Sequence, residues 1–322
     1  MTYAVILGEA LIDLLSTADG ALTPVVGGAP FNVAVGLARL GTPAHLLTAV
    51  GGDTFGDRIV DYAAAAGVGV GGIVRVPAPT PLAVATYTGS EASFAFYGDP
   101  PAYGMLAPTD LDPDLLAGAS VLYCGSIALL GAASLRAARH AWATPGPLRA
   151  FDPNVRPFLL PDAHAAARLR AIVEEFSAGA DLVKLSLADA TALYGPVPPS
   201  RVALRLLALG AGTVVVTLGA AGAMIFRHRD DAAPRPERMA VDYIHSRAES
   251  VFGLPVHPGQ VIDTTGAGDS VVAALMHRML AGLPDSGSWI EAVEFALRVS
   301  AHVCARRGGA VAMPTLVELA AS

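Results

Sequence analysis

Cysteine and charged residues are both scarce in this sequence. Two cysteines, Cys124 and Cys304, occur among 322 residues, too few for a multi-disulfide framework and in keeping with a reducing compartment. We therefore expect free thiols in the core of a cytoplasmic protein. Charged residues make up 15% of the chain and apolar residues 53%, whereas disordered chains are poor in apolar residues and rich in charge. The composition therefore predicts a large buried core.

A surplus of positive charge is also missing. The chain has 21 Lys and Arg against 28 Asp and Glu, a formal net charge of −7. This balance argues against a surface built to neutralise the phosphates of nucleic acid or of anionic lipid. The first residues, Met1–Glu9, lack a basic segment and favour a first β-strand over a signal peptide. We expect neither nucleic acid nor a membrane as a partner.

The segment Leu206–Phe226 contains no charged residue and is long enough to cross a bilayer. Four glycines interrupt it, however, and Thr213–Leu218 is β-branched in the manner of a buried strand. Two buried strands joined by a glycine turn explain the segment better than a membrane helix does.

Two nucleotide-binding motifs are absent or out of place. No Gly-x-x-x-x-Gly-Lys-Ser/Thr loop occurs, so a Walker-type NTPase is unsupported. Gly67–Gly72 matches the dinucleotide fingerprint in letters, but it follows a helix-like segment, Asp57–Ala66, and precedes a strand-like one, Ile73–Val76. The fingerprint requires the opposite order, so we interpret Gly67–Gly72 as a turn.

Strand-like and helix-like segments alternate along most of the chain. This order predicts parallel crossovers and a sheet covered on both faces, hence a doubly wound α/β core in a single domain, 1–322. The expected strands are Tyr3–Leu7, His45–Val50, Val121–Cys124, Leu148–Phe151, Leu182–Leu185 and Thr213–Leu218, and the expected helices are Pro30–Leu40, Phe55–Ala66, Ser134–Trp142, Ala163–Phe176 and Arg201–Leu209.

Two segments break this alternation. Leu82–Thr88 and Ser93–Tyr97 alternate polar and apolar residues around a Gly-Ser-Glu turn, which is typical of a hairpin with one face toward solvent. A hairpin that projects from an α/β core is a candidate lid. Arg227–Arg238 contains several charges and two prolines, and we expect an exposed loop there.

The sharpest local signal is the segment Asp263–Ser270, Asp-Thr-Thr-Gly-Ala-Gly-Asp-Ser. It follows a strand-like Gln260–Ile262 and precedes a helical run, Val271–Leu280. The unpaired N–H groups at a helix start attract anions, and glycine lets a phosphate approach the backbone closely. A carboxylate at this point, Asp269, is either a helix cap or a base that accepts a hydroxyl proton during phosphoryl transfer.

A second glycine-rich element, Gly27–Ala34, lies early in the chain. Pro30 suits the first turn of a helix, and the paired glycines suit a tight entry to it. Asn32 offers a donor and an acceptor to a polyol, and Asp13, at the end of Leu11-Ile12-Asp13, offers a further acceptor. Taken singly, Asn32 is equally a cap and Asp13 equally a strand-end carboxylate.

Together these elements resemble the two signatures of the ribokinase (PfkB) family of carbohydrate kinases, in the same order along the chain. Gly8–Asp13 and Phe151–Pro157 resemble its fructokinase branch, Thr217-Leu218-Gly219 with Gly222 resembles its nucleotide-binding turn, and Cys304–Ala310 with Pro314 resembles its C-terminal segment.

The resemblance implies a ribokinase-like α/β/α sandwich with a β-sheet lid contributed by about 11–27 and 80–104, and a homodimer formed through that lid. It implies an ATP-dependent kinase, with Mg²⁺ on the ATP phosphates and a monovalent cation such as K⁺ beside the anion hole. Asp269 would be the base. The implied residues are Gly266, Ala267, Gly268 and the Asp269 N–H for the anion hole, Asp13, Gly28, Asn32 and Arg156 for the sugar, Lys184, Ser186, Asp189, Thr217, Gly219 and Gly222 for the nucleotide, and Asp263 and Thr265 for the cation.

The sequence departs from the family pattern at three points. Ser186 and Asp189 stand where the family often has an Asn-x-x-Glu element that organises Mg²⁺. Gly98 stands after Phe96-Tyr97 where fructokinase-like chains often have an arginine, and Val271 stands in place of an aromatic residue. Fructose is the expected substrate, with 2-keto-3-deoxygluconate, ribose or a nucleoside as alternatives, and a non-catalytic sugar sensor as an alternative of another class.

Overall fold

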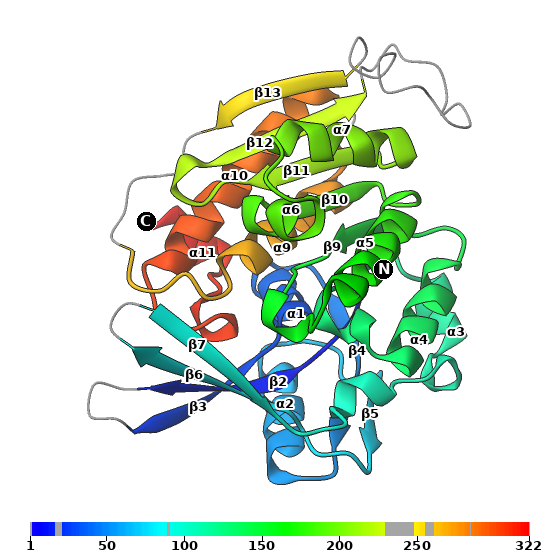
Figure 1. Ribbon diagram of the computed structural model, residues 1–322, viewed down its shortest axis with the longest axis vertical. Helices are drawn as coiled ribbons and strands as arrows, with labels where there is room; N and C mark the ends of the chain where they lie inside the picture. Colours follow the sequence, from blue (N-terminus) through cyan, green and yellow to red (C-terminus); the bar gives the residue numbers. More distant parts are fainter. Residues whose placement is uncertain are drawn as a thin grey trace.

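The protein is seen here in a computed structural model that describes residues 2–16, 21–88, 91–228, 248–254, 261–283 and 285–321. Its main sheet has nine strands in the order β13-β12-β11-β10-β9-β8-β1-β4-β5 (Figure 1). The seven strands from β11 to β5 run parallel, and β12 and β13 are antiparallel to their neighbours. These strands are β1 (Ala4–Leu7), β4 (Ala44–Gly51), β5 (Ile73–Val76), β8 (Val121–Gly125), β9 (Leu148–Asp152), β10 (Leu182–Ser186), β11 (Thr213–Thr217), β12 (Ala223–His228) and β13 (Ala248–Leu254).

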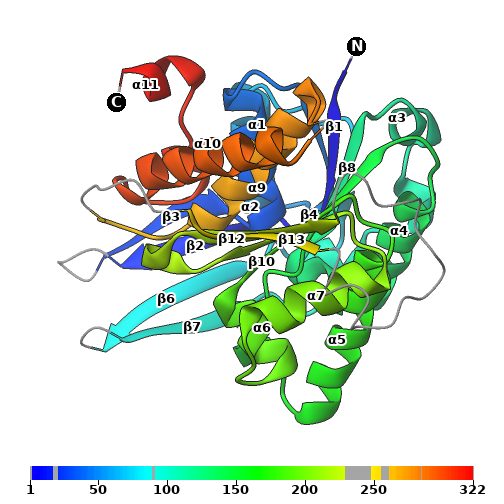
Figure 2. The same cartoon turned by 90° about the horizontal axis from the view of Figure 1, so that it is seen from above.

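Helices cover both faces of this sheet, as the alternation of segments predicted (Figure 2). One layer holds α1 (Ala29–Arg39), α2 (Thr54–Ala65), α9 (Ala267–Ala281) and α10 (Ser286–Cys304). The other holds α3 (Pro113–Ala117), α4 (Ala132–Trp142), α5 (Ala163–Ser177), α6 (Leu187–Tyr194) and α7 (Pro199–Leu209). Each layer packs its apolar side chains on one face of the sheet, so the central strands are buried on both faces. The short α11 (Leu316–Ala320) lies beside α10.

The order of strands reverses beside β1. From β1 the chain moves to β4 and β5 on one side, and later to β8, β9, β10 and β11 on the other. In open α/β sheets, ligands bind outside the carboxyl ends of the strands at such a reversal. Glu9, Asp152, Ser186 and Thr217 lie at or just after the carboxyl ends of β1, β9, β10 and β11. The topology therefore gathers polar residues from distant parts of the sequence.

A second, four-stranded sheet projects from the main α/β body (Figure 1). Its order is β3-β2-β6-β7, with β2 (Leu11–Ser16), β3 (Leu22–Gly27), β6 (Leu82–Thr88) and β7 (Glu91–Tyr97). The predicted hairpin is confirmed as β6 and β7, which pair antiparallel. Asp13 lies inside β2, opposite Val25 and Ala83, and the prediction that it ends a strand is wrong because the strand continues to Ser16.

Other predictions are settled by local geometry. Gly67–Gly72 connects α2 to β5 as a turn, which confirms that it is no dinucleotide motif.

Val261 and Ile262 are exposed and outside any strand, so the predicted strand is wrong at these residues. Ile262 instead donates its N–H to Cys304 O at the end of α10 (2.8 Å). Arg227 belongs to β12 and not to a loop, whereas 229–238 lie outside the described residues.

The uncharged Leu206–Phe226 segment folds as the end of α7, the strand β11, a glycine turn and most of β12. This confirms the two strands and the glycine turn that its composition predicted. Across the described part of the chain, none of the helices combines the length and apolar character needed to span a membrane.

The N-terminus of α2 provides a test of how the second sheet is attached. The carboxylate of Asp53 caps α2 by accepting the Gly56 N–H, and it also accepts the Thr80 N–H ahead of β6, both at 2.8 Å. We predict that Asp53→Ala lowers the free energy of unfolding by about 1–3 kcal/mol, because it removes a helix cap and a bond between segments. Chemical denaturation measures this. Asp285→Ala, which removes a solvent-exposed cap of α10, serves as the comparison; an equal or larger loss there would contradict the argument.

Candidate active site

Residues 266–269 at the start of α9 form the glycine turn that the sequence predicted as a candidate anion site, and it is called the anion-binding turn for that reason. Gly266 precedes the helix with a left-handed backbone (φ 78°), and a Cβ there would lie 2.7 Å from the Cα of Gly309. The first helical bond of the turn runs from Ser270 N–H to Gly266 O (2.8 Å). The N–H groups of Gly268 and Asp269 precede this bond and point out of the helix. They are therefore available to an anion.

Ala267 departs from this expectation. Its N–H donates to Thr264 O (3.2 Å), so it is already engaged in the turn and is not a free donor for an anion. Its carbonyl accepts hydrogen bonds from the hydroxyls of Ser270 and Ser300. Ala267 therefore stabilises the turn, while Gly268 and Asp269 present their N–H groups.

Asp269 is a buried carboxylate with a hydrogen bond to each oxygen. Its side chain is only 6% exposed. Asn32 Nδ2 donates to Oδ2 (2.7 Å), and Asn154 Nδ2 donates to Oδ1 (3.1 Å). Burial raises the pKa of Asp269, against the Asn32 hydrogen bond and the positive charge of Lys184, which favour the carboxylate form. A general base needs both a pKa that lets it accept a proton and a side chain that is held in one orientation.

The segment that follows β9 supplies a contact that sequence reasoning missed. Asn154 has a positive φ of 37°, a conformation that asparagine tolerates better than most residues. Its own N–H donates to Asp152 Oδ1 (3.0 Å), and Lys184 Nζ donates to Asp152 Oδ2 (2.9 Å). In the sequence, Phe151–Pro157 stands out only because it resembles the fructokinase branch. The sequence alone indicates no role for Asp152 or Asn154.

One end of the site carries polar groups suited to a sugar. Burial raises the pKa of Asp13 to about 7, with Arg156 opposing the shift and the negative charge of Asp269 adding to it. Arg156 is exposed at the mouth. Gly28, with φ 105°, packs so closely that a Cβ would lie 2.7 Å from Glu9 O. The Oδ1 atom of Asn32 is buried and has no hydrogen-bond partner in the described structure.

The opposite end is built from glycine turns and one lysine. Thr217 ends β11, and Gly219 and Gly222 follow it with positive φ values of 59° and 89°. Lys184 is buried, and its Nζ lies close to Gly268: a Cβ on residue 268 would be 2.8 Å from this Nζ atom. Although burial works against its charge, Asp152 and Asp189 raise the pKa of Lys184. A positive charge therefore stands beside the anion-binding turn.

Ser186 and Asp189 form a helix cap. The Ser186 N–H and hydroxyl both donate to Asp189 Oδ2 (2.7 and 2.6 Å), and the Val155 N–H donates to Asp189 Oδ1 (2.7 Å). The shorter Asp in place of the family's Glu thus ties α6 to the segment after β9. Their part in binding a nucleotide or its metal stays a prediction.

Asp263 joins two loops beside the anion-binding turn. Its Oδ1 accepts the N–H and hydroxyl of Thr265 (2.9 and 2.7 Å), and its Oδ2 accepts the Gly308 N–H (2.9 Å). Although burial opposes ionisation, these bonds keep the pKa of Asp263 below its usual value. Within the described residues there is no group of three or more His, Cys, Asp or Glu side chains placed to hold a metal ion.

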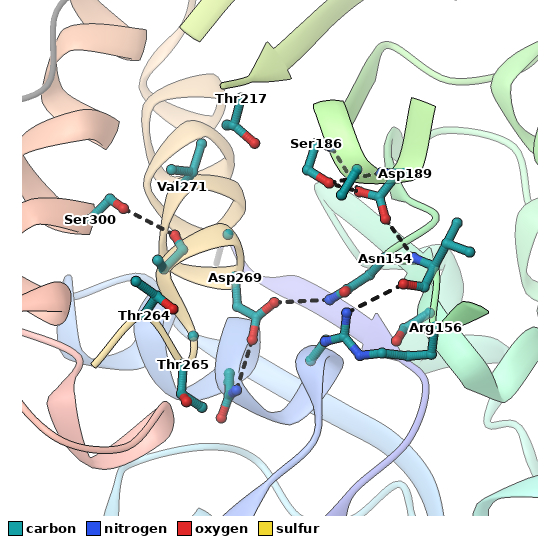
Figure 3. A pocket seen from close by; sticks show the side chains of 18 of the residues that line it. Asn154, Arg156, Ser186, Asp189, Thr217, Thr264, Thr265, Asp269, Val271 and Ser300 are labelled. Atoms are coloured by element: carbon teal, nitrogen blue, oxygen red, sulfur yellow. Dashed lines mark hydrogen bonds between the residues drawn. The ribbon is translucent and has the colours of Figure 1, made fainter. Parts of the chain in front are cut away.

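A single cavity of about 940 Å³ joins the two ends, with Asp269 between them (Figure 3). Figure 3 shows the Asp269 carboxylate turned toward Asn154 and Arg156, with Thr217 on the far side. All of the predicted site residues except Asp263 line this cavity. The lining contains Asp13, Gly28, Asn32, Arg156, Lys184, Ser186, Asp189, Thr217, Gly219, Gly222, Thr265, Gly266, Ala267, Gly268 and Asp269.

Two further residues, Cys304 and Glu9, lie at positions that the sequence did not predict. Cys124 is a buried free thiol as predicted, but Cys304 is only half-buried and lines the cavity, so its assignment to the core is wrong. It ends α10 close to the loop before α9, and this tertiary contact was not visible in the sequence. Glu9 was noticed as part of Gly8–Asp13 but given no role.

Comparison with known proteins agrees with this geometry. The model of the pfkB family of carbohydrate kinases matches residues 1–316. Fructokinase-1 of Oryza sativa subsp. japonica is 32% identical over 330 residues, which cover 97% of this chain and 94% of the relative. Probable fructokinase-7 of Arabidopsis thaliana is 32% identical over 334 residues, covering 98% of this chain and 90% of the relative.

Solved structures give the same result. Fructokinase from Xylella fastidiosa with bound ATP superimposes with a TM-score of 0.84 at 28% identity, covering 99% of this chain and 97% of that one. Fructokinase from Vibrio cholerae, in a form with bound fructose, ADP and calcium ion, gives 0.83 at 27% identity, covering 100% and 98%.

Glu9 provides a test of the cavity's electrostatics. Its carboxylate accepts the N–H groups of Ala29 (3.3 Å) and Ala128 (3.2 Å), and burial raises its pKa to about 7, against hydrogen bonds from Ser126 and Ala128. Because the folded pKa exceeds the usual glutamate pKa of 4.5, the folded state binds more protons than the unfolded state between these two pH values. The contribution of Glu9 to stability therefore falls as pH rises from about 4.5 to about 7.

We predict that Glu9→Gln, which cannot ionise, removes this contribution. The unfolding free energy of the variant relative to the wild type should shift in the variant's favour as pH rises through that window. Denaturant unfolding of both proteins at matched pH values measures the difference. A difference that does not change with pH would contradict the raised pKa.

Proposed function

The chain belongs to the pfkB family of carbohydrate kinases, and we propose that it transfers the γ-phosphoryl group of ATP to a hydroxyl group of D-fructose. The observation that carries the proposal is the position of Asp269. This buried carboxylate lies at the start of α9, beside two outward N–H groups, in one cavity that reaches from Asp13 to Thr217. Phosphoryl transfer needs little more than a positioned acceptor, a base and stabilised phosphate charge.

In the proposed reaction, Asp269 accepts the proton of the sugar hydroxyl. The hydroxyl oxygen forms a bond to the γ-phosphorus while the bond from that phosphorus to the β–γ bridging oxygen breaks, and ADP leaves with the bonding electron pair. The N–H groups of Gly268 and Asp269 and the ammonium group of Lys184 stabilise the negative charge on the transferred group. The chain thus supplies the base and the charge stabilisation from adjoining elements.

The sugar would lie at the end formed by Asp13, Gly28, Asn32 and Arg156. Asp13 offers an acceptor for sugar hydroxyls, Arg156 offers donors, and Asn32 lines the same end of the cavity. Fructose is favoured because the two plant relatives at 32% identity and the Xylella fastidiosa and Vibrio cholerae structures at 28% and 27% identity are named fructokinases.

The nucleotide would lie over Thr217, Gly219 and Gly222, with its phosphates reaching Lys184 and the start of α9. Ser186 and Asp189 border this path. The glycine turn and the buried cation suit a triphosphate, and Mg²⁺ would enter on the phosphates, where it neutralises charge. Asp263 and Thr265 would lie beside a monovalent cation such as K⁺. The Vibrio cholerae fructokinase has been solved with a potassium ion in one form and a calcium ion in another.

We also propose that the second sheet, within 11–27 and 80–104, closes over the sugar as a lid. The same sheet would join two subunits into a homodimer. It would belong to a single kinase domain, 1–322. The rings of Phe96 in β7 and Phe158 after β9 lie 5.5 Å apart between centroids, and both line the cavity, which supports a closing role for this sheet. A cytoplasmic location is in keeping with the two free thiols.

The acceptor is tested by ADP release from ATP and Mg²⁺ with fructose, ribose, 2-keto-3-deoxygluconate and a nucleoside, with the product identified by ³¹P NMR. We predict the highest kcat/KM with fructose. Preference for another acceptor would overturn the fructose assignment but not the kinase. Binding of sugar and ATP without turnover on any acceptor would instead establish a non-catalytic sensor.

Asp13 is tested with the same assay. We predict that Asp13→Asn raises KM for fructose by roughly tenfold or more, because a hydrogen bond to a charged group is lost, while KM for ATP stays unchanged. Asp61→Asn, the same replacement at an exposed position on α2, is the control. Equal effects on the two KM values would place Asp13 outside the sugar site.

The cation is tested by measuring turnover at rising KCl against a choline chloride background of constant ionic strength. We predict activation by K⁺ in the wild type and a higher half-saturating K⁺ concentration in Asp263→Asn, since the ionised carboxylate contributes to cation affinity. Turnover that is independent of K⁺ in the wild type would contradict this proposal.

A further inference from the structure

The segment after β9 holds an unusual residue beside the catalytic base. Asn154 has a positive φ of 37°, and it is 8% exposed. Most residues avoid this conformation, whereas glycine adopts it freely and Asn or Asp adopts it more easily than the rest. In this conformation, the Asn154 side-chain amide reaches Asp269 Oδ1 while its backbone N–H reaches Asp152 Oδ1. One residue thus joins two buried carboxylates.

Asp152 is fixed from its other side by Lys184. Both side chains are buried, with Asp152 0% exposed, and Lys184 Nζ donates to Asp152 Oδ2 at 2.9 Å. Burial raises the pKa of Asp152 to about 6, whereas the Lys184 ammonium group at hydrogen-bond distance favours its carboxylate form. A buried ion pair holds its geometry strongly, because removing either partner leaves an uncompensated charge.

The contacts form one continuous path in the wall of the cavity, where Lys184, Asn154 and Asp269 line the cavity and Asp152 is buried behind them. Lys184 stands beside Gly268 at the anion-binding turn, Asp152 binds Lys184, Asn154 binds Asp152, and Asn154 binds Asp269. A fifth residue, Asn32 of α1, holds the other oxygen of Asp269. The group that would meet the ATP phosphates and the group that would take the proton are therefore connected through a single segment.

We propose that Asn154 is a positioning residue for Asp269, and that the Asp152–Lys184 ion pair holds Asn154 in the conformation that this requires. Asn154 touches neither reacting atom; it acts by directing one oxygen of the base and by stabilising its carboxylate form. This inference rests on the proposed kinase activity only for its kinetic test.

Several other ionisable groups face Asp269 and must be held constant in such a test. Lys184 and Arg156 favour its charged form, Asp13 and Asp152 repel it by like charge, and the Tyr123 hydroxyl, whose pKa the Asp269 charge helps to raise, stays neutral. A replacement at Asn154 leaves all five in place. Any change in the titration of Asp269 can then be assigned to the lost amide.

The variant of choice is Asn154→Gly, because glycine keeps the positive φ and removes only the side chain. We expect kcat to fall roughly tenfold to a hundredfold from misplacement of the base, with KM for ATP unchanged. We also expect the acidic limb of the kcat profile to move up by about one pH unit, since the amide that stabilises the carboxylate is gone. Asn154→Asp should move the acidic limb further up, because the new carboxylate places a like charge beside Asp269.

Asp181→Asn is the matched control, since the Asp181 carboxylate accepts the Arg149 N–H (2.8 Å) at the opposite end of β9 and β10. It should leave kcat and the pH profile unchanged. A uniform fall of kcat in Asn154→Gly without movement of the acidic limb would overturn the proposal, because a purely structural defect acts in that way.

A second measurement separates this inference from the proposed function. Titration of the Asp269 carboxyl carbon by ¹³C NMR, in wild type and in Asn154→Gly, needs no turnover. If no sugar is phosphorylated but the Asp269 pKa rises in the variant, the proposed function fails and the positioning role stands. An unchanged pKa in a variant with wild-type thermal stability would overturn the positioning role.

Discussion

The burial of one carboxylate, Asp269, imposes a constraint on much of this structure. An ionised carboxylate withdrawn from water costs several kcal/mol unless it receives hydrogen bonds or an opposite charge. The protein supplies two amide donors, from residues 237 and 115 positions away along the chain, and two outlying cations, Lys184 and Arg156. This environment of Asp269 can therefore exist only in the folded chain, and the fold has to bring α1, β9 and β10 to the start of α9.

The order of the strands accomplishes this. Because the chain moves to opposite sides of β1, the carboxyl ends of β1, β9, β10 and β11 open onto one cavity. The start of α9 faces these ends, and the second sheet borders the cavity through Leu11, Asp13, Ala83 and Phe96. The end of the cavity proposed for the sugar and the end proposed for the nucleotide then meet at Asp269. In a pfkB-family carbohydrate kinase, this meeting point is where the phosphoryl group would cross.

The sequence predicted those parts of the structure that local patterns encode. Apolar runs marked the parallel strands, and Gly266, Gly268 and Asp269 marked the anion-binding turn. The errors came where tertiary contacts decide. Ile262 leaves its predicted strand to bind the end of α10, and Cys304 faces the cavity. Asn154 and Glu9 were left without roles, because a hydrogen bond between residues more than 100 positions apart has no local pattern in a single sequence.

The central claim is that Asp269 is the base. It is tested most directly by rapid-quench measurement of a single turnover with ATP, Mg²⁺ and fructose, comparing the wild type with Asp269→Asn, together with ATP affinity measured separately. We expect the rate of phosphoryl transfer to fall by roughly two to four orders of magnitude in the variant, while ATP binding is largely kept. A transfer rate within a few-fold of wild type would contradict it and place the base on another residue.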